Sequence, residues 1–324
     1  MLSRVAENLF WMSRYFERAD NLARLVTVHQ TDLLDATSAM AEDSYDWHPL
    51  LAVTSMGDEN STESVQDYMV RSQENPDSIT NCIYQARENG RAVRDQISDE
   101  MWIELNALWL DLKAILKNGP GQHEKICQMV NRSSLVFRGI VNVAQPRAEA
   151  WAFIQLGEYL ERADKTSRVI DLPNYLRGRD EASAWSTMLR ACSAAAEHRR
   201  HYSGEADSTS ASTLLLFSTS FPRSVRFCVQ KIDDLLHQIS GTDSSGYLNE
   251  AERASGSLLA RMNFSGVEEI SSLGLHDYVD SVQFNLNEIG AAIGFRYFAL
   301  TKESPSSSAE EFFKIRMRSI QKQQ

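Results

Sequence analysis

The beginning of the chain carries apolar side chains at alternating spacings of four and three residues. This spacing places them on one stripe of an α-helix and is typical of a helix that packs along a neighbour in a bundle. The stretch from Leu9 to Val26 is therefore predicted to be helical. The stripe consists of Val5, Leu9, Met12, Phe16, Ala19, Ala23 and Val26.

Two further stripes of the same predicted helix mix apolar and charged residues. One contains Phe10, Arg14, Glu17, Asn21 and Arg24, and the other contains Trp11, Tyr15, Arg18, Leu22 and Leu25. A helix of this kind is expected to be buried on more than one side. Its charged side chains then need charged partners rather than water alone.

Similar patterns along the chain predict an all-α protein, a helical bundle. Only 7 prolines and 15 glycines interrupt the 324 residues, which suits long helices. Asn75-Pro76 is a helix-start signal with Pro at an early helical position, and Pro173 is predicted to end a helix. Further helices are predicted near 47–55, 79–97, 99–116, 124–143, 153–170, 185–202, 248–262 and 278–298.

The opening stretch occurs a second time in the chain. Residues 9–26, LFWMSRYFERADNLARLV, match residues 153–170, FIQLGEYLERADKTSRVI, at a shift of 161 − 17 = 144. NPDSITNC from Asn75 also matches FPRSVRFC from Phe221, at a shift of 222 − 76 = 146. The two matches predict an internal duplication of roughly 145 residues. We therefore expect one helical domain over 1–300, with halves of about 1–145 and 146–300, followed by a Ser-rich break and basic tail over 301–324.

Composition narrows the class of protein. A net charge of −11 argues against a general binder of nucleic acid or anionic membranes. The four cysteines form no CxxC pair and are predicted to be reduced core thiols. Charged residues near the N-terminus interrupt the apolar core that a signal peptide requires. No window of the sequence reaches the roughly 18–20 apolar residues of a membrane span. A cytoplasmic protein is expected.

The charged residues of the repeated block are the first candidates for a site. The coinciding residues are Tyr15/Tyr159, Glu17/Glu161, Arg18/Arg162, Ala19/Ala163, Asp20/Asp164 and Arg24/Arg168. Three interpretations are open: a buried structural ion-pair network, a functional site, and a solvated face with i,i+4 pairs. As a site, it would offer Glu17 and Glu161 as acids or bases.

A second candidate lies in ARENGRAVR, where Arg87, Arg91 and Arg94 accompany Glu88. The corresponding segment of the second half, DDLLHQI, has no arginine. These arginines are predicted either to bind a phosphate or carboxylate, with Glu88 as a catalytic candidate, or to pair with acids such as Glu17 or Glu104.

Common catalytic patterns are missing from the sequence. A di-metal carboxylate bundle needs Glu-x-x-His pairs, and none is present. There is no Gly-x-Ser-x-Gly nucleophile elbow and no Gly-rich phosphate loop. No metal and no cofactor are predicted.

The quoted blocks, together with WAFIQLGEYLERADKTSRVID, resemble the bacterial alpha-E domain family over nearly the whole chain, in the right order. The resemblance implies an all-helical protein encoded beside a circularly permuted ATP-grasp protein and a transglutaminase-like peptidase. It therefore implies a role in making or processing a peptide-like amide product, with an ATP-grasp ligase as partner. The family pattern places Gly-Arg before each block's Tyr, whereas this chain has Ser13-Arg14 and Gly157-Glu158.

We expect a helical accessory or substrate-binding component, and the alternatives are an enzyme acting on a peptide-like substrate or a purely structural scaffold. Homo-oligomerisation stays open. The residues proposed to bind an anion or substrate are Arg14, Arg18, Arg87, Arg91, Arg94, Arg162 and Arg168.

Overall fold

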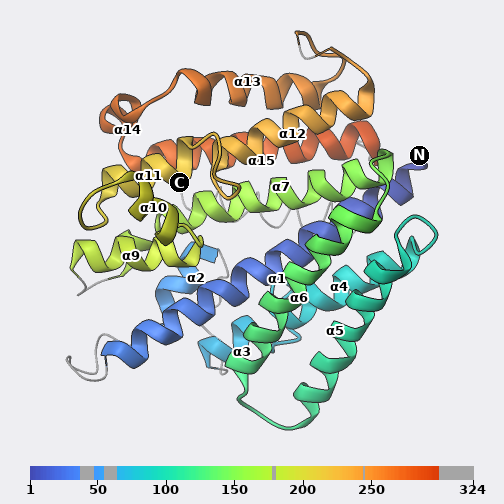
Figure 1. The fold of residues 1–324 in the computed structure, drawn as a ribbon, viewed down its shortest axis with the longest axis horizontal. Helices are drawn as coiled ribbons and strands as arrows, with labels where there is room; N and C mark the ends of the chain where they lie inside the picture. Colours follow the sequence, from blue (N-terminus) through green and yellow to red (C-terminus); the bar gives the residue numbers. More distant parts are fainter. Residues whose placement is uncertain (37–46, 55–63, 177–179, 244, 299–324) are drawn as a thin grey trace.

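The computed structural model describes residues 1–36, 47–54, 64–176, 180–243 and 245–298. Every regular element within these ranges is an α-helix, which confirms the all-α prediction (Figure 1). The predicted tail over 301–324 lies outside the described residues. None of the described helices combines the length and the apolar character that a membrane crossing requires.

Four long helices of the first half pack in a closed circuit. In it α1 contacts α4, α4 contacts α5, α5 contacts α6, and α6 returns to α1. A buried core fills the circuit, and the predicted stripe on α1 contributes Leu9, Met12 and Phe16 to it. The four helices are α1 (Ser3–Ala36), α4 (Ile79–Ala92), α5 (Asp99–Lys117) and α6 (His123–Ala144).

Four helices of the second half pack in the same order. Here α7 contacts α12, α12 contacts α13, α13 contacts α15, and α15 returns to α7. The two circuits meet chiefly where α1 lies against α7, which runs through the middle of the molecule in Figure 1. The four helices are α7 (Glu149–Ile170), α12 (Val225–Ser240), α13 (Glu250–Phe264) and α15 (Leu275–Tyr297).

Short helices fill the remaining described segments. Three of them, α9 to α11, lie beside the end of α7 on one side of the molecule (Figure 1). The short helices are α2 (His48–Thr54), α3 (Val65–Val70), α8 (Leu172–Tyr175), α9 (Glu181–Ala191), α10 (Ala195–His201), α11 (Ser208–Phe217) and α14 (Val267–Leu273).

Three sequence predictions about helix ends were wrong. The predicted helix over 185–202 is two helices, because Ser193 between them adopts a left-handed φ of 54°. Pro76 lies before the helix rather than in its first turn, since Ser78 is the N-cap of α4. Pro173 does not end α7, which stops at Ile170; it lies at the start of α8 instead.

The matching Pro-x-Ser segments begin α4 and α12 in the same way. Ser78 Oγ accepts the backbone N–H of Asn81, and Ser224 Oγ accepts that of Phe227, each at 3.1 Å. Such caps satisfy a backbone donor that the first helical turn leaves without a partner. They also fix the two residues that precede the serines, Asp77 and Arg223, beside α1.

The backbones of α1 and α7 come unusually close at Gly157. A Cβ built on Gly157 would lie 2.3 Å from the carbonyl oxygen of Phe10, a distance no side chain can accept. Only a residue without a side chain lets the two helices approach this far. The glycine thus sets the separation of the two circuits.

Gly157→Ala should destabilise the protein by about 1–3 kcal/mol or more, because the added methyl group meets backbone that cannot move aside. Gly139→Ala is the matched control, since a Cβ at this α6 glycine has nothing within 4 Å. The control should gain about 0.5–1 kcal/mol from helix propensity. Urea unfolding followed by circular dichroism measures both, and equal stability of the two variants would contradict the close approach.

Candidate functional site

The charged residues of both E-R-A-D blocks are buried where α1 crosses α7. Glu17 and Arg18 are each 1% exposed, and Glu161 is fully buried. Because water does not reach them, their charges must be balanced by one another. The six repeated acids and bases at the crossing are Glu17, Arg18, Asp20, Glu161, Arg162 and Asp164.

The two blocks exchange their ion pairs. Arg18 Nε donates to Glu161 Oε1 at 2.6 Å, while Arg162 Nε donates to Glu17 Oε1 at 2.9 Å. Each glutamate therefore pairs with the arginine of the other helix rather than of its own. Charge-assisted contacts of this kind are directional, so they fix the register of α1 against α7.

Glu161 lies at the centre of the first group of charges. Arg14 Nε donates to its Oε2 at 2.8 Å, and Lys165 Nζ lies 3.6 Å from its Oε1. Arg18 also donates to Asp77, the residue held by the cap of α4. Tyr15 packs beneath the Arg18 guanidinium, with 5.4 Å between Cζ and the ring centre.

Glu17 lies at the centre of the second group. Arg162 Nη2 donates to its Oε2 at 3.0 Å, and Arg138 of α6 donates to the same oxygen. Arg223, held before α12, lies 3.6 Å from Glu17 Oε1. Arg162 also donates to Glu158, which replaces the expected arginine of the second block.

The surrounding arginines keep both central glutamates ionised. Burial alone would raise the pKa of Glu17, but Arg138 and Arg162 outweigh it and hold that pKa well below its ordinary value. Burial would also raise the pKa of Glu161, but Arg18 and Arg14 outweigh this effect and hold that pKa below its ordinary value. Neither carboxyl group takes up a proton near neutral pH.

The i,i+4 pairs of the sequence analysis are present and complete these groups. Arg24 Nη2 donates to Asp20 Oδ2 at 2.9 Å, and Arg168 Nη2 lies 3.0 Å from Asp164 Oδ1. Within the described residues the E-R-A-D charges thus form a buried ion-pair network rather than a solvated face.

The arginines after Ala86 lie apart from this network. Arg87 donates to Glu88 at 2.5 Å and to Asn106 at 2.9 Å, and Arg91 donates to Glu88 from a largely exposed position. Arg94 stacks on Trp102, with Cζ 4.8 Å from the ring centre. The structure pairs Arg87 with Glu88 and Asn106, not with Glu17 or Glu104.

The network includes Arg223, Asp77 and Arg138, for which the sequence predicted no role. Arg223 and Asp77 occupy the same place in the two matching Pro-x-Ser segments, and that match was the available signal. Arg24 was recognised only as the partner of Asp20. Arg138 lies on α6, outside every repeated block, and nothing in the sequence marks it.

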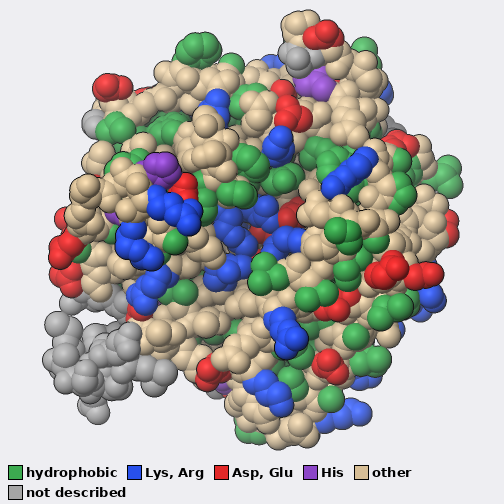
Figure 2. Space-filling view, in the orientation of Figure 1, with side chains coloured by type: hydrophobic (Ala, Val, Ile, Leu, Met, Phe, Trp, Pro, Cys, Tyr) green, Lys and Arg blue, Asp and Glu red, His purple; other side chains and the backbone are tan. Residues whose placement is uncertain are grey.

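The second group reaches the surface in part. The side chains of Arg24 and Arg138 are each 18% exposed and that of Arg223 is 12% exposed. Figure 2 shows Lys and Arg side chains gathered in a hollow at the centre of one face, over the crossing of α1, α6 and α7.

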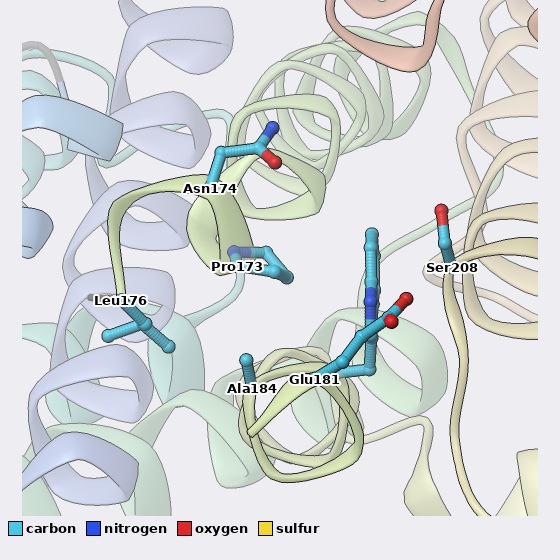
Figure 3. Close-up of a pocket in the computed structure, with 7 residues that line it drawn as sticks. Pro173, Asn174, Leu176, Glu181, Ala184 and Ser208 are labelled. Carbon is cyan, nitrogen blue, oxygen red and sulfur yellow. The ribbon is translucent and has the colours of Figure 1, made fainter. Parts of the chain in front are cut away.

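A separate cavity of about 320 Å³ lies between α8, α9 and α11 (Figure 3). No residue proposed from the sequence lines it. Its described lining offers one carboxylate, Glu181, and one hydroxyl, Ser208, across from Pro173 and Leu176.

The described residues include four buried cysteines and one group of His and Asp side chains that could hold a metal ion. Burial raises the pKa of Cys127, Cys192 and Cys228 to about 12, so these thiols stay protonated at neutral pH. Asp171, His276 and Asp280 lie close together, but the two carboxylates face opposite ring nitrogens of the histidine. That is the arrangement of a histidine bridging two acids.

Comparison with known proteins identifies the architecture. The model of the Alpha-E family, described as "a predicted alpha-helical domain with a conserved ER motif", matches residues 1–298. Uncharacterized proteins of Mycobacterium bovis and Mycobacterium tuberculosis are 23% identical over 308 residues, covering 84% of this chain and 34% of theirs. The chain thus spans about a third of the length of these curated relatives. No solved structure gives a significant match.

Glu161→Gln keeps the shape of the side chain but leaves Arg14 and Arg18 buried without their shared carboxylate. Removing one partner of a buried ion pair costs about 3–5 kcal/mol. The variant should lose about that much unfolding free energy in urea titrations. Glu250→Gln, which breaks an exposed i,i+3 pair with Arg253, is the control and should unfold like the parent protein.

Acid should destabilise the protein through the same carboxylates. Their folded pKa values lie below the unfolded value of about 4.3, so their contribution is complete above that pH and is lost as the pH falls toward the folded values. Urea midpoints measured between pH 7 and pH 3 should hold steady at first and fall below about pH 4.5. Midpoints that do not fall in acid would contradict buried, ionised glutamates.

Proposed function

The chain belongs to the Alpha-E family, and on that premise we propose that it is a helical accessory or substrate-binding component of an ATP-grasp-linked system that forms or processes peptide-like amide bonds. One observation carries the proposal: both glutamates of the ER blocks are ionised, buried and enclosed by arginines.

These glutamates are poorly suited to catalysis. A general acid or base works best with a pKa near the operating pH and must reach the proton that it transfers. Glu17 and Glu161 meet neither condition, because their pKa values are lowered and their oxygens already accept from arginines. On this proposal the chemistry belongs to a partner and the helical protein supplies binding and position.

The partner that we propose is an ATP-grasp ligase, with a transglutaminase-like protein as a further member of the system. Such a ligase would activate a carboxylate with ATP and join it to an amine. The present chain has no Gly-rich phosphate loop in its sequence, so nucleotide binding would fall to the ligase.

We also infer that the two helical circuits arose by duplication of about 145 residues. Three parallels support this: the order of contacts within the circuits, the serine caps of α4 and α12, and the exchanged Arg-Glu pairs. In a duplicated scaffold the exchanged pairs would lie about a pseudo-twofold axis.

The proposal predicts that the purified chain captures the ATP-grasp ligase encoded beside its gene and raises the turnover of that ligase. Pulldown followed by ligase assays, with and without the helical protein, measures both effects. An ATP-grasp ligase from an unrelated system is the control and should neither bind nor respond. If the neighbouring ligase forms no complex and works equally well alone, the accessory role is excluded.

A further inference from the structure

The charges around Glu17 do not balance. Three carboxylates and four guanidinium groups contact one another there, and no other charged residue of the described chain makes an ion pair with them. The sum is 4 − 3, an excess of one positive charge. The acids are Glu17, Asp20 and Glu158, and the bases are Arg24, Arg138, Arg162 and Arg223.

Two side chains show the effect of this excess. Arg24 Nε is buried and has no hydrogen-bond partner in the described part of the protein. Burial lowers the pKa of Arg223, and although Glu17 and Asp20 oppose this, Arg24 and Arg162 add to it, so the pKa stays below its ordinary value. A buried donor without an acceptor and a crowded cation are both relieved by a bound anion.

One cation of this group comes from the turn before α12. At the place where the turn before α4 has Asp77, paired with Arg18, this turn has Arg223, which donates to Asp20 at 2.9 Å and to Asn21 at 2.8 Å. The cap of Ser224 holds it there. An arginine thus joins a group whose carboxylates already have cationic partners.

The excess charge is accessible from outside. The side chains of Arg24, Arg138 and Arg223 are partly exposed, and Arg24 Nη1 donates to Ser193 Oγ, in the turn between α9 and α10, at 3.0 Å. Figure 2 shows Lys and Arg side chains gathered in a hollow on one face of the molecule. A ligand can therefore reach the arginines without opening the helix crossing.

We propose that this hollow binds the free carboxylate group of a peptide, held by Arg24 and Arg223. A carboxylate carries the single negative charge that the group lacks, and its two oxygens match the paired N–H donors of a guanidinium group. Phosphate at neutral pH carries more charge than the excess, and would overcompensate it. The proposal rests on the proposed substrate-binding role and names its ligand class.

The test compares the dipeptide Ala-Ala with Ala-Ala amide, which has nearly the same size but no carboxylate. Isothermal titration calorimetry on the full chain at low ionic strength should show saturable binding of the dipeptide and none of the amide. Inorganic phosphate serves as the third probe. Equal binding of dipeptide and amide, no binding of the dipeptide, or binding of phosphate alone would overturn the proposal.

Two pairs of variants locate the site. Ser193→Asp places a carboxylate beside Arg24 at a left-handed position that Asp and Asn both tolerate, so it should abolish dipeptide binding, while Ser193→Asn leaves it intact. Arg24→Gln should weaken binding about tenfold or more. Arg168→Gln, the corresponding change on α7, should not.

Thermal unfolding of each variant separates lost binding from lost folding. Because Ser193 is exposed, its aspartate variant keeps the network and tests the site even if Arg24→Gln unfolds. Undiminished dipeptide binding by the folded Ser193→Asp variant would place the ligand elsewhere. The dipeptide titration and the ligase pulldown are independent tests. A failed pulldown would not contradict dipeptide binding, and absent dipeptide binding would not contradict the ligase complex.

Discussion

The exchange of ion pairs between α1 and α7 is the interaction on which the rest of this structure depends. Each glutamate is removed from water and accepts hydrogen bonds from an arginine of the opposite helix, Glu17 from Arg162 and Glu161 from Arg18. Such pairs cost desolvation, and well-packed apolar side chains could be equally stable. What they add is specificity, because a helix crossing at the wrong register would bury charges without partners.

The desolvation cost of the buried glutamates explains why several arginines surround Glu17. Arginines from α6 and from the turn before α12 converge on Glu17, and their own alignment depends on features outside the crossing, such as the cap at Ser224. The network therefore joins elements far apart in sequence into one electrostatic unit. Its members are coupled, so the effects of substituting two of them should not add.

The sequence predicted the helices of the two circuits except α12, because their apolar stripes face a core whatever the tertiary details. The burial of Glu17 and Glu161 was one of three interpretations, and the periodicity suggested it by leaving few solvent-facing positions on α1. Arg138 could not be found, since its role depends on where α6 lies in space. The break at Ser193 was missed because a left-handed serine leaves no mark in hydrophobic periodicity.

The contact at Gly157 has a consequence for how this molecule can respond to a ligand. With the Phe10 carbonyl against its Cα, α7 cannot rotate or slide along α1 without driving a neighbouring side chain into backbone. The contact therefore resists rotation and sliding of one circuit against the other when a ligand binds. We therefore expect a ligand to bind a surface that is already formed in the free protein, with little movement of the backbone.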